Sequence, residues 1–240
     1  AGNQHLGQQG QRRGVAAHRR SDERRAREDQ RTSPQRPLTP MPAGTKPQGD
    51  GLAIIFSAPS GAGKTTLVRH LMTKPELTLG FSVSATTRDP RKGEVDGRDY
   101  HFLAPDDFAQ RVKNGAFVEY EEVYEGLSYG TLCSEVERLW RDGRTPLFDV
   151  DVVGGQTLKS VFGDSALSIF VLPPSMLALE DRLRGRGTED EAALEKRIAK
   201  SQQEMEAASA FDLRLVNDDL DLAKQEAEDM VGDFLERTFL

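Results

Sequence analysis

A glycine-rich segment that ends in a lysine and a threonine has the composition of a phosphate-binding loop. Residues 58–65 read APSGAGKT, which fits G-x-x-x-x-G-K-[ST] except that Ala58 stands at the first glycine position. In such a loop, backbone N–H groups surround the phosphates, and the following helix adds the positive end of its dipole. Lys64 would reach the β- and γ-phosphates of a nucleoside triphosphate, and the Thr65 hydroxyl would ligate Mg²⁺. The predicted triphosphate-binding residues are Ala58, Pro59, Ser60, Gly61, Ala62, Gly63, Lys64, Thr65 and Thr66.

Two arginines farther along the chain have the chemistry of a second phosphate site. Arg88 and Arg91 are three residues apart in a segment stiffened by Pro90. A guanidinium group is always charged and makes bidentate contacts with phosphate oxygens. We therefore expect both arginines to converge on one phosphate dianion, although a bare pair of this spacing is also compatible with a solvated basic loop.

The elements that must position these residues alternate between strand and helix. An apolar run at 52–56 precedes the phosphate loop, and apolar residues at helical spacing follow it. The later predicted strands are Pro146–Val152, Ala166–Leu172 and Phe211–Val216, and the later predicted helices are a Ser175-capped helix to Arg184, Glu189–Ala208 and Leu220–Leu235. This alternation predicts an α/β domain with a parallel sheet. Residues 80–131 do not follow this strand–helix alternation, which favours an inserted α+β lobe.

The segment around the two arginines completes a family pattern. Residues 86–102 satisfy T-[ST]-R-x-x-[KR]-x-x-[DE]-x-x-G-x-x-Y-x-[FY] at every fixed position, so the chain resembles guanylate kinase from about Gly51 to its C-terminus. The resemblance implies a P-loop NTPase-type parallel sheet flanked by helices, with a core of 51–80 and 132–240, an acceptor-binding lobe at about 81–131 and a helical lid at about 183–195. It also implies a cytoplasmic enzyme that uses ATP and Mg²⁺ to phosphorylate GMP to GDP in purine nucleotide metabolism and GMP recycling.

The resemblance further implies which residues bind GMP. The phosphate would be held by Arg88 and Arg91 with hydroxyl groups of two tyrosines, and the base by Glu119 and Asp149. A carboxylate opposite guanine N1–H makes a charge-assisted bond that adenine cannot make. Since residues i and i+2 of a strand share a face, Asp151 would also point toward the nucleotides, and we assign it to water-mediated Mg²⁺ contact. The implied GMP-binding residues are Ser84, Arg88, Arg91, Glu94, Tyr100, Glu119, Tyr129, Thr131, Asp149 and Asp151.

A lid is the last implied part of the site. Arg182, Arg186 and Arg197 would close over the phosphates and exclude water, with Gly185 and Gly187 permitting the hinge motion. Asn217 and Asp218 match the family's adenine-side loop. The predicted catalytic residues are Lys64, Arg88, Arg182, Arg186 and Arg197.

Composition excludes several other classes of protein. The 240 residues contain one cysteine, Cys133, and four scattered histidines, so neither a disulfide framework nor a zinc site of the usual spacing is expected. No apolar run approaches the ~20 residues of a membrane helix. Residues 1–50 carry ten Lys/Arg and five Asp/Glu, whereas the rest carries 22 and 34. An acidic body argues against general nucleic-acid binding.

The basic segment at residues 1–48 is predicted to be disordered, because it has almost no apolar side chains to bury. It is either a solvated tail or a basic arm that touches acidic surfaces or nucleic acid. A natural start at Met41 is a further hypothesis.

Two other functions remain open at this level. One is a non-catalytic scaffold module of the same fold that binds phosphopeptides at the acceptor site. The other is a kinase of a different small phosphorylated acceptor. Use of dGMP beside GMP, and the choice between monomer and homo-oligomer, are also left open.

Overall fold

The computed structural model describes residues 44–124, 126–185 and 191–237. Most of the predicted disordered tail, including Met41, lies outside the described residues, as do Arg186 and Gly187 of the predicted lid. Residues 1–36 and 37–240 form separate units, and the elements below all belong to the second.

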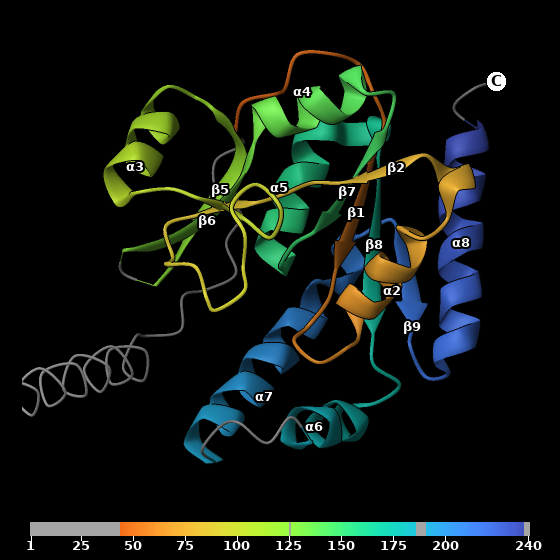
Figure 1. Cartoon of the computed structure of the whole chain (residues 1–240). Coiled ribbons are helices and arrows are strands. Elements are labelled where there is room, and N and C mark those ends of the chain that lie inside the picture. The colour runs from red at the N-terminus through yellow and green to blue at the C-terminus, as the bar shows by residue number, and fades with distance from the viewer. Residues whose placement is uncertain (1–43, 125, 186–190, 238–240) are drawn as a thin grey trace, which may run out of the picture. The chain divides into compact units, whose positions relative to one another are not determined.

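The described part of the chain contains a central sheet of five parallel strands in the order β2-β7-β1-β8-β9 (Figure 1). The strands are β1 Ala53–Ser57, β2 Leu79–Phe81, β7 Thr145–Asp149, β8 Ala166–Leu172 and β9 Leu213–Val216. β1 lies in the middle and is buried at every position, as its continuous apolar run predicts. The predicted bounds of β8 are confirmed, whereas β7 ends at Asp149 rather than Val152, because Asp151 caps the next helix instead of extending the strand.

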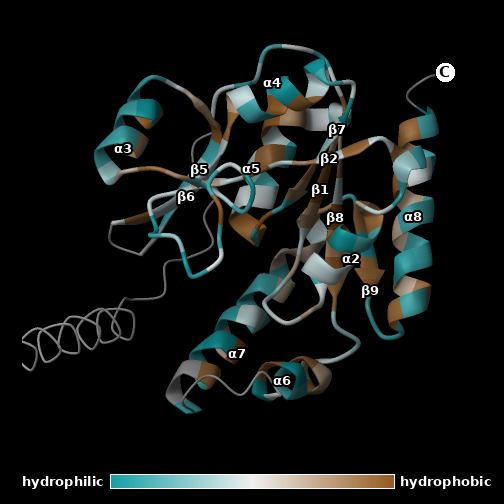
Figure 2. Ribbon diagram, in the orientation of Figure 1, coloured by the Kyte–Doolittle hydropathy of each residue, from teal (hydrophilic) through white to brown (hydrophobic). Residues whose placement is uncertain are grey.

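Helices cover both faces of this sheet. The described helices are α2 Lys64–Leu71, α3 Pro105–Lys113, α4 Cys133–Arg141, α5 Val152–Phe162, α6 Met176–Arg184, α7 Glu191–Glu206 and α8 Leu220–Arg237, with short 3₁₀ turns at Pro75–Leu77, Gly163–Ser165 and Ala207–Ala210. Ile54 and Phe56 of β1 belong to the core on the α2 and α8 side, and Ala53 and Ile55 to the core on the α4 and α5 side. This follows from the alternation of side chains along a strand. Figure 2 shows the central strands in brown between helices with extensive teal surface.

A second sheet interrupts the alternation where the sequence predicts an inserted segment. It has the order β4-β3-β6-β5 among the described residues. Its strands are β3 Ala85–Thr86, β4 His101–Phe102, β5 Phe117–Tyr124 and β6 Leu127–Leu132. β5 and β6 form an antiparallel pair, and a small core that includes Phe108 of α3 packs against them.

The carboxyl ends of the parallel strands meet at one edge of the central sheet, where ligands bind in open α/β folds. The loop after β1, the turn after β7 and the turn after β9 all lie at this edge, and α6 and α7 lie beside it (Figure 1). In the part of the chain that the structure describes, no helix combines the length and apolarity needed to cross a membrane.

Candidate active site

The loop between β1 and α2 requires glycine at two positions. Gly61 and Gly63 have φ angles of 96° and 97°, which non-glycine residues rarely adopt. A Cβ on Gly63 would also lie 2.2 Å from Nδ2 of Asn217, which donates a hydrogen bond of 2.7 Å to the carbonyl of Ala62. Ala58, in contrast, has no positive φ and packs in the core at 7% exposure. The alanine that departs from the loop pattern therefore occupies a position where a side chain is accommodated.

Lys64 and Thr65, the first residues of α2, both contact Asp149 at the end of β7. Lys64 Nζ is 2.6 Å from Asp149 Oδ1 and also donates to the carbonyl of Val150. Thr65 Oγ1 donates to Asp149 Oδ2 at 3.0 Å. One carboxylate thus holds the lysine and the hydroxyl of the phosphate loop together, at a helix N-terminus suited to anions.

A cleft of about 240 Å³ opens beside the same carboxylate. Asp149 and Asp151 line it, as do Tyr129 of β6 and Ser84, the residue just before β3. Glu119 of β5 also lines it, at 7% exposure, with Oε1 accepting a hydrogen bond of 2.6 Å from Thr131 Oγ1. The cleft is therefore rich in hydrogen-bond acceptors, which suits a ligand that presents N–H groups.

Burial governs the protonation of this cleft. It raises the pKa of Glu119 to about 7, with the nearby charge of Asp151 adding to the effect and the Thr131 hydrogen bond opposing it. Burial and the charge of Asp151 likewise raise the pKa of Glu121, which also lines the cleft, to about 8. Near neutral pH the cleft can therefore hold protons that a ligand would displace.

The structure places Asp149 and Asp151 on different elements, whereas we expected both to end one strand. We assigned Asp149 to the base and Asp151 to Mg²⁺, on the argument that both end one strand. Instead Asp149 ends β7 and contacts the phosphate loop, whereas Asp151 is the N-cap of α5 and accepts from Gly154 N at 2.8 Å. A Cβ on Gly154 would lie 3.2 Å from Asp151 Oδ1 and 3.3 Å from Glu119 Oε2, so the glycine lets these two carboxylates approach.

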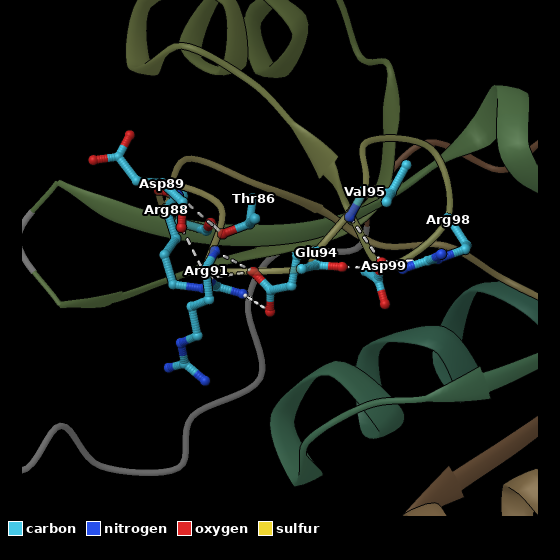
Figure 3. Close-up of polar contacts among 10 residues, drawn as sticks. Thr86, Arg88, Asp89, Arg91, Glu94, Val95, Arg98 and Asp99 are labelled. Atoms are coloured by element: carbon cyan, nitrogen blue, oxygen red, sulfur yellow. Dashed lines mark hydrogen bonds and ion pairs between the residues drawn. The ribbon is translucent and has the colours of Figure 1, made fainter.

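Arg88 is held in place by its neighbours in the loop after β3. Its two terminal nitrogens contact the two Glu94 oxygens at 2.9 and 3.0 Å (Figure 3). Its guanidinium lies 5.2 Å from the centre of the Tyr100 ring. Glu94 first, and then Tyr129, raise the pKa of Arg88, and the Tyr129 ring centre is 6.0 Å from that of Tyr100. Arg88, Tyr100 and Tyr129 are therefore brought together, and Glu94 serves as the partner that orients Arg88.

The predicted convergence of the two arginines is not present in this conformation. Arg91 is exposed, and Figure 3 shows its guanidinium directed away from Arg88 and Glu94. Its backbone N–H, by contrast, donates to Glu94 at 2.6 Å. The loop thus fixes the main chain of Arg91 while its side chain extends to the surface.

Two arginines of the predicted lid contact the phosphate loop. Arg182 of α6 donates to the carbonyl of Ala62 in the loop at 3.5 Å and to that of Asn217 at 2.9 Å, and Arg197 of α7 donates to Ser60 Oγ at 2.6 Å. Ser175 caps α6 as predicted, accepting from Ala178 N at 3.1 Å. The predicted catalytic residue Arg186 lies outside the described residues.

The predicted adenine-side residues differ in placement. Asn217 is buried with its amide on the loop backbone, whereas Asp218 is exposed. The Asn217 side chain therefore supports the loop.

Oxygen atoms make up the donor set available to a metal. Among the described residues, no group of three His, Cys, Asp or Glu side chains is arranged to hold one. The Thr65 hydroxyl and the Asp149 carboxylate, 3.0 Å apart, nevertheless fit Mg²⁺, which prefers oxygen ligands and keeps several waters and substrate phosphates. Asp151 accepts the capping hydrogen bond from Gly154 N, and no contact to Thr65 is found for it among the described residues.

Comparison with known proteins decides the family. The family model described as guanylate kinase matches residues 51–234, more than half of the chain. The chain belongs to the guanylate kinase family. A guanylate kinase of Porphyromonas gingivalis is 48% identical over 182 residues, which cover 76% of this chain and 97% of that protein. One of Salinibacter ruber is 50% identical over the same length, covering 76% and 96%.

A solved guanylate kinase has the same fold. The crystal structure of the enzyme from Anaplasma phagocytophilum aligns with a TM-score of 0.57 at 27% identity, over 81% of this chain and 89% of that one. The resemblance read from residues 86–102 and from the phosphate loop is confirmed, and so is the predicted α/β fold with a parallel sheet flanked by helices.

The guanylate kinase pattern did not point to Glu121. This residue lies two positions after Glu119 on β5, pairs in register with Tyr129 and lines the cleft. The alternation E-x-E at residues 119–121 was the available signal, because in a strand it would put both carboxylates on one face. Its neighbours Asp151 and Lys200 come from distant parts of the chain, which no local pattern could indicate.

Proposed function

We propose that this protein transfers the γ-phosphoryl group of ATP to GMP, giving ADP and GDP. The observation that carries the proposal is the position of Asp149, which contacts Lys64 and Thr65 of the phosphate loop and also lines the acceptor-rich cleft. A donor phosphate chain in the loop and an acceptor in the cleft would therefore meet at this carboxylate. Positioning and charge stabilisation supply most of the catalysis in phosphoryl transfer.

ATP would occupy the loop between β1 and α2. Its backbone N–H groups and Lys64 would hold the phosphates, and Arg182 and Arg197 would neutralise charge from the side of α6 and α7. Arg186 is assigned to the same lid because the family pattern places an arginine there. Asn217 would shape the loop rather than contact adenine, and Asp218 remains the candidate on the adenine side.

GMP would occupy the cleft, with its phosphate toward Arg88, Tyr100 and Tyr129. An oxygen of this phosphate is already an anionic nucleophile, so no general base is needed. It attacks the γ-phosphorus as the bond to the β–γ bridging oxygen breaks, and ADP leaves with that electron pair. Arg91 would swing inward to add a second guanidinium to the acceptor phosphate.

The guanine base would be read at the deep end of the cleft. Glu119 and Asp151 would accept hydrogen bonds from N1–H and the 2-amino group, while hydroxyl groups of Ser84 and Thr131 complete the polar lining. Adenine offers neither donor in that position, so it would leave buried acceptors unpaired.

Mg²⁺ would be held at Thr65 and Asp149, in part through water, as the oxygen-only donor set supports. When bound, it neutralises charge on the β- and γ-phosphates. The side chains of Lys64 and Thr65 fix the place of that charge at the N-terminus of α2.

The larger organisation follows from these assignments. Residues of about 81–131 would form the acceptor-binding lobe, residues of about 183–195 the lid, and 51–80 with 132–240 the core. We place the reaction in the cytoplasm, where both nucleotides occur. We expect dGMP to be accepted as well as GMP, because no assigned contact reads the 2′-hydroxyl.

A coupled assay of ADP release tests the proposal, with GMP, dGMP, AMP and UMP as acceptors. We expect turnover with GMP and dGMP, and values of kcat/KM lower by about 10³-fold or more for AMP and UMP. Absence of turnover with every acceptor would favour the phosphopeptide-binding module, and turnover without preference for GMP would favour a different kinase. Lys64→Met is the matched negative variant, since it removes the charge and keeps the length of the side chain.

A further inference from the structure

Two glutamates on one strand face the same cleft. β5 pairs with β6 without irregularity from Glu119, opposite Thr131, to Glu121, opposite Tyr129. Side chains two residues apart on a regular strand point the same way. Tyr120, between them, points the other way and packs against the small core that contains Phe117. Glu121 is therefore presented to the cleft as directly as Glu119.

The two glutamates differ in their partners. Glu119 receives a hydrogen bond from Thr131, whereas Oε2 of Glu121 is buried and receives none from any donor among the described residues. A buried carboxylate oxygen without a donor costs substantial free energy. The cost is avoided if Glu121 carries a proton and acts as the donor itself.

Asp151 is the acceptor within reach of that proton. Asp151 and Glu121 line the same cleft, and a side-chain hydrogen bond between the two carboxyl groups contributes to the raised pKa of Glu121. Two carboxyl groups can form such a bond only when one of them is protonated. Burial and the negative charge of Asp151 raise the pKa of Glu121 to about 8, while Lys200 of α7 lowers it and Glu119 raises it. The charges that face Glu121 thus favour the protonated form at neutral pH.

Among the hydrogen bonds of the described residues, one from the backbone fixes a single oxygen of the Asp151 carboxylate. Its Oδ1 accepts from Gly154 N at the start of α5. A second hydrogen bond, from Glu121, would fix the plane of the carboxylate and keep its charge. A carboxylate so oriented is an acceptor for an amino group of a base in the cleft.

We propose that Glu121 is a positioning residue, which donates its carboxyl proton to Asp151 and thereby holds that carboxylate toward the guanine of GMP. The inference rests on the proposed function. Glu121 would act through Asp151, without touching the reacting phosphates.

The test compares Glu121→Ala with Glu121→Gln, because glutamine keeps an N–H donor and alanine does not. We expect Glu121→Ala to raise the KM for GMP by about tenfold, the usual cost of one hydrogen bond to a charged group, with little change in the KM for ATP. Glu121→Gln should stay within about threefold of the wild type. Glu122→Gln, on the exposed neighbouring residue, is the matched control and should leave both constants unchanged.

Two results would overturn the inference: an unchanged KM for GMP in Glu121→Ala, or a loss in Glu121→Gln as large as that in Glu121→Ala. The second result would mean that the carboxylate itself accepts from the base. Thermal melting checks the fold, and Glu121→Leu, which fills the volume without a donor, replaces the alanine variant if that one unfolds. Lack of GMP turnover by the wild type would instead refute the proposed function, so the two failures are distinguishable.

Discussion

Lys64 Nζ lies 2.6 Å from Asp149 Oδ1, and this ion pair joins the phosphate loop to the wall of the cleft. Both side chains are largely withdrawn from water, at 16% and 14% exposure. The carboxyl end of β7 is therefore the point at which the two halves of the site meet. Removing one member of such a pair leaves the other charge without its partner in a poorly solvated position.

The roles that we propose for the two aspartates, Asp149 at the phosphate loop and Asp151 at the base, predict separable kinetic effects. Asp149→Asn should lower kcat by about 10²-fold or more with a small change in the KM for GMP, because it disturbs Lys64 and Thr65. Asp151→Asn should mainly raise the KM for GMP. Steady-state kinetics with each substrate varied in turn measures both, and each variant is the control for the other. The reverse result, a raised KM for GMP in Asp149→Asn and a lowered kcat in Asp151→Asn, would contradict this assignment.

The elevated pKa of Glu119 predicts how GMP binding depends on pH. The ionised carboxylate accepts a stronger, charge-assisted hydrogen bond from guanine N1–H than the protonated acid does, and burial raises the pKa of this group to about 7. The affinity for GMP should therefore strengthen as the pH rises from about 6 to about 7.5, below the pKa of about 8 of Glu121, with protons released on binding. Calorimetry in buffers of different ionisation enthalpy measures the release. Affinity that weakens over this interval would be inconsistent with the assignment.

The raised pKa of Glu119 also predicts that removing its charge increases the free energy of unfolding. The pKa of Glu119 is higher in the folded chain than in the unfolded one, so the folded state binds the extra proton between about pH 4.5 and 7. The free energy of unfolding thus falls as the pH rises through this range. Glu119→Gln should be more stable than the wild type at pH 8, by on the order of 1–3 kcal/mol, and closer to it at pH 5. Denaturant titrations at the two pH values measure this, and equal stability of the two proteins at both pH values would argue against a buried, proton-binding carboxyl.

We expect substitutions at two small residues of the phosphate loop to differ in their effect on stability and ATP binding. Gly63→Ala should destabilise the chain by about 1–3 kcal/mol and weaken ATP binding, because the new methyl group would displace Asn217 from Ala62. Ala58→Gly restores the usual loop pattern and should cost less than about 1.5 kcal/mol, from the lost methyl packing and backbone entropy. Melting temperatures and ATP affinity compare the two. A tolerated Gly63→Ala would show that the close approach of Asn217 is not required.

The features that the sequence predicted well are local in the chain. The apolar run before the phosphate loop and the apolar spacing after it predict β1 and α2, because strand, turn and helix follow one another directly. Ala166–Leu172 likewise reads as a buried strand at its true bounds. In these segments the local pattern and the tertiary contacts agree.

The features that the sequence missed depend on contacts between distant segments. Asp149 and Asp151 look equivalent as i and i+2 of a strand, until the capping bond to Gly154 ends the strand between them. The side-chain direction of Arg91 is set by the conformation of its loop, which its spacing from Arg88 does not fix. The sequence thus identified most of the polar side chains of the candidate site, whereas their orientation relative to one another depends on the tertiary structure.

Binding of a single ligand that spans both sites tests the central claim most directly. An adenosine and a guanosine joined through five phosphates would place one base at each site and its phosphates across Asp149. Calorimetry should show one molecule bound per chain, with a dissociation constant at least about 100-fold below that of GMP or ATP alone, and exclusion of both nucleotides. Binding no tighter than that of ATP, with GMP still able to bind beside it, would contradict a site in which the two nucleotides meet head to head.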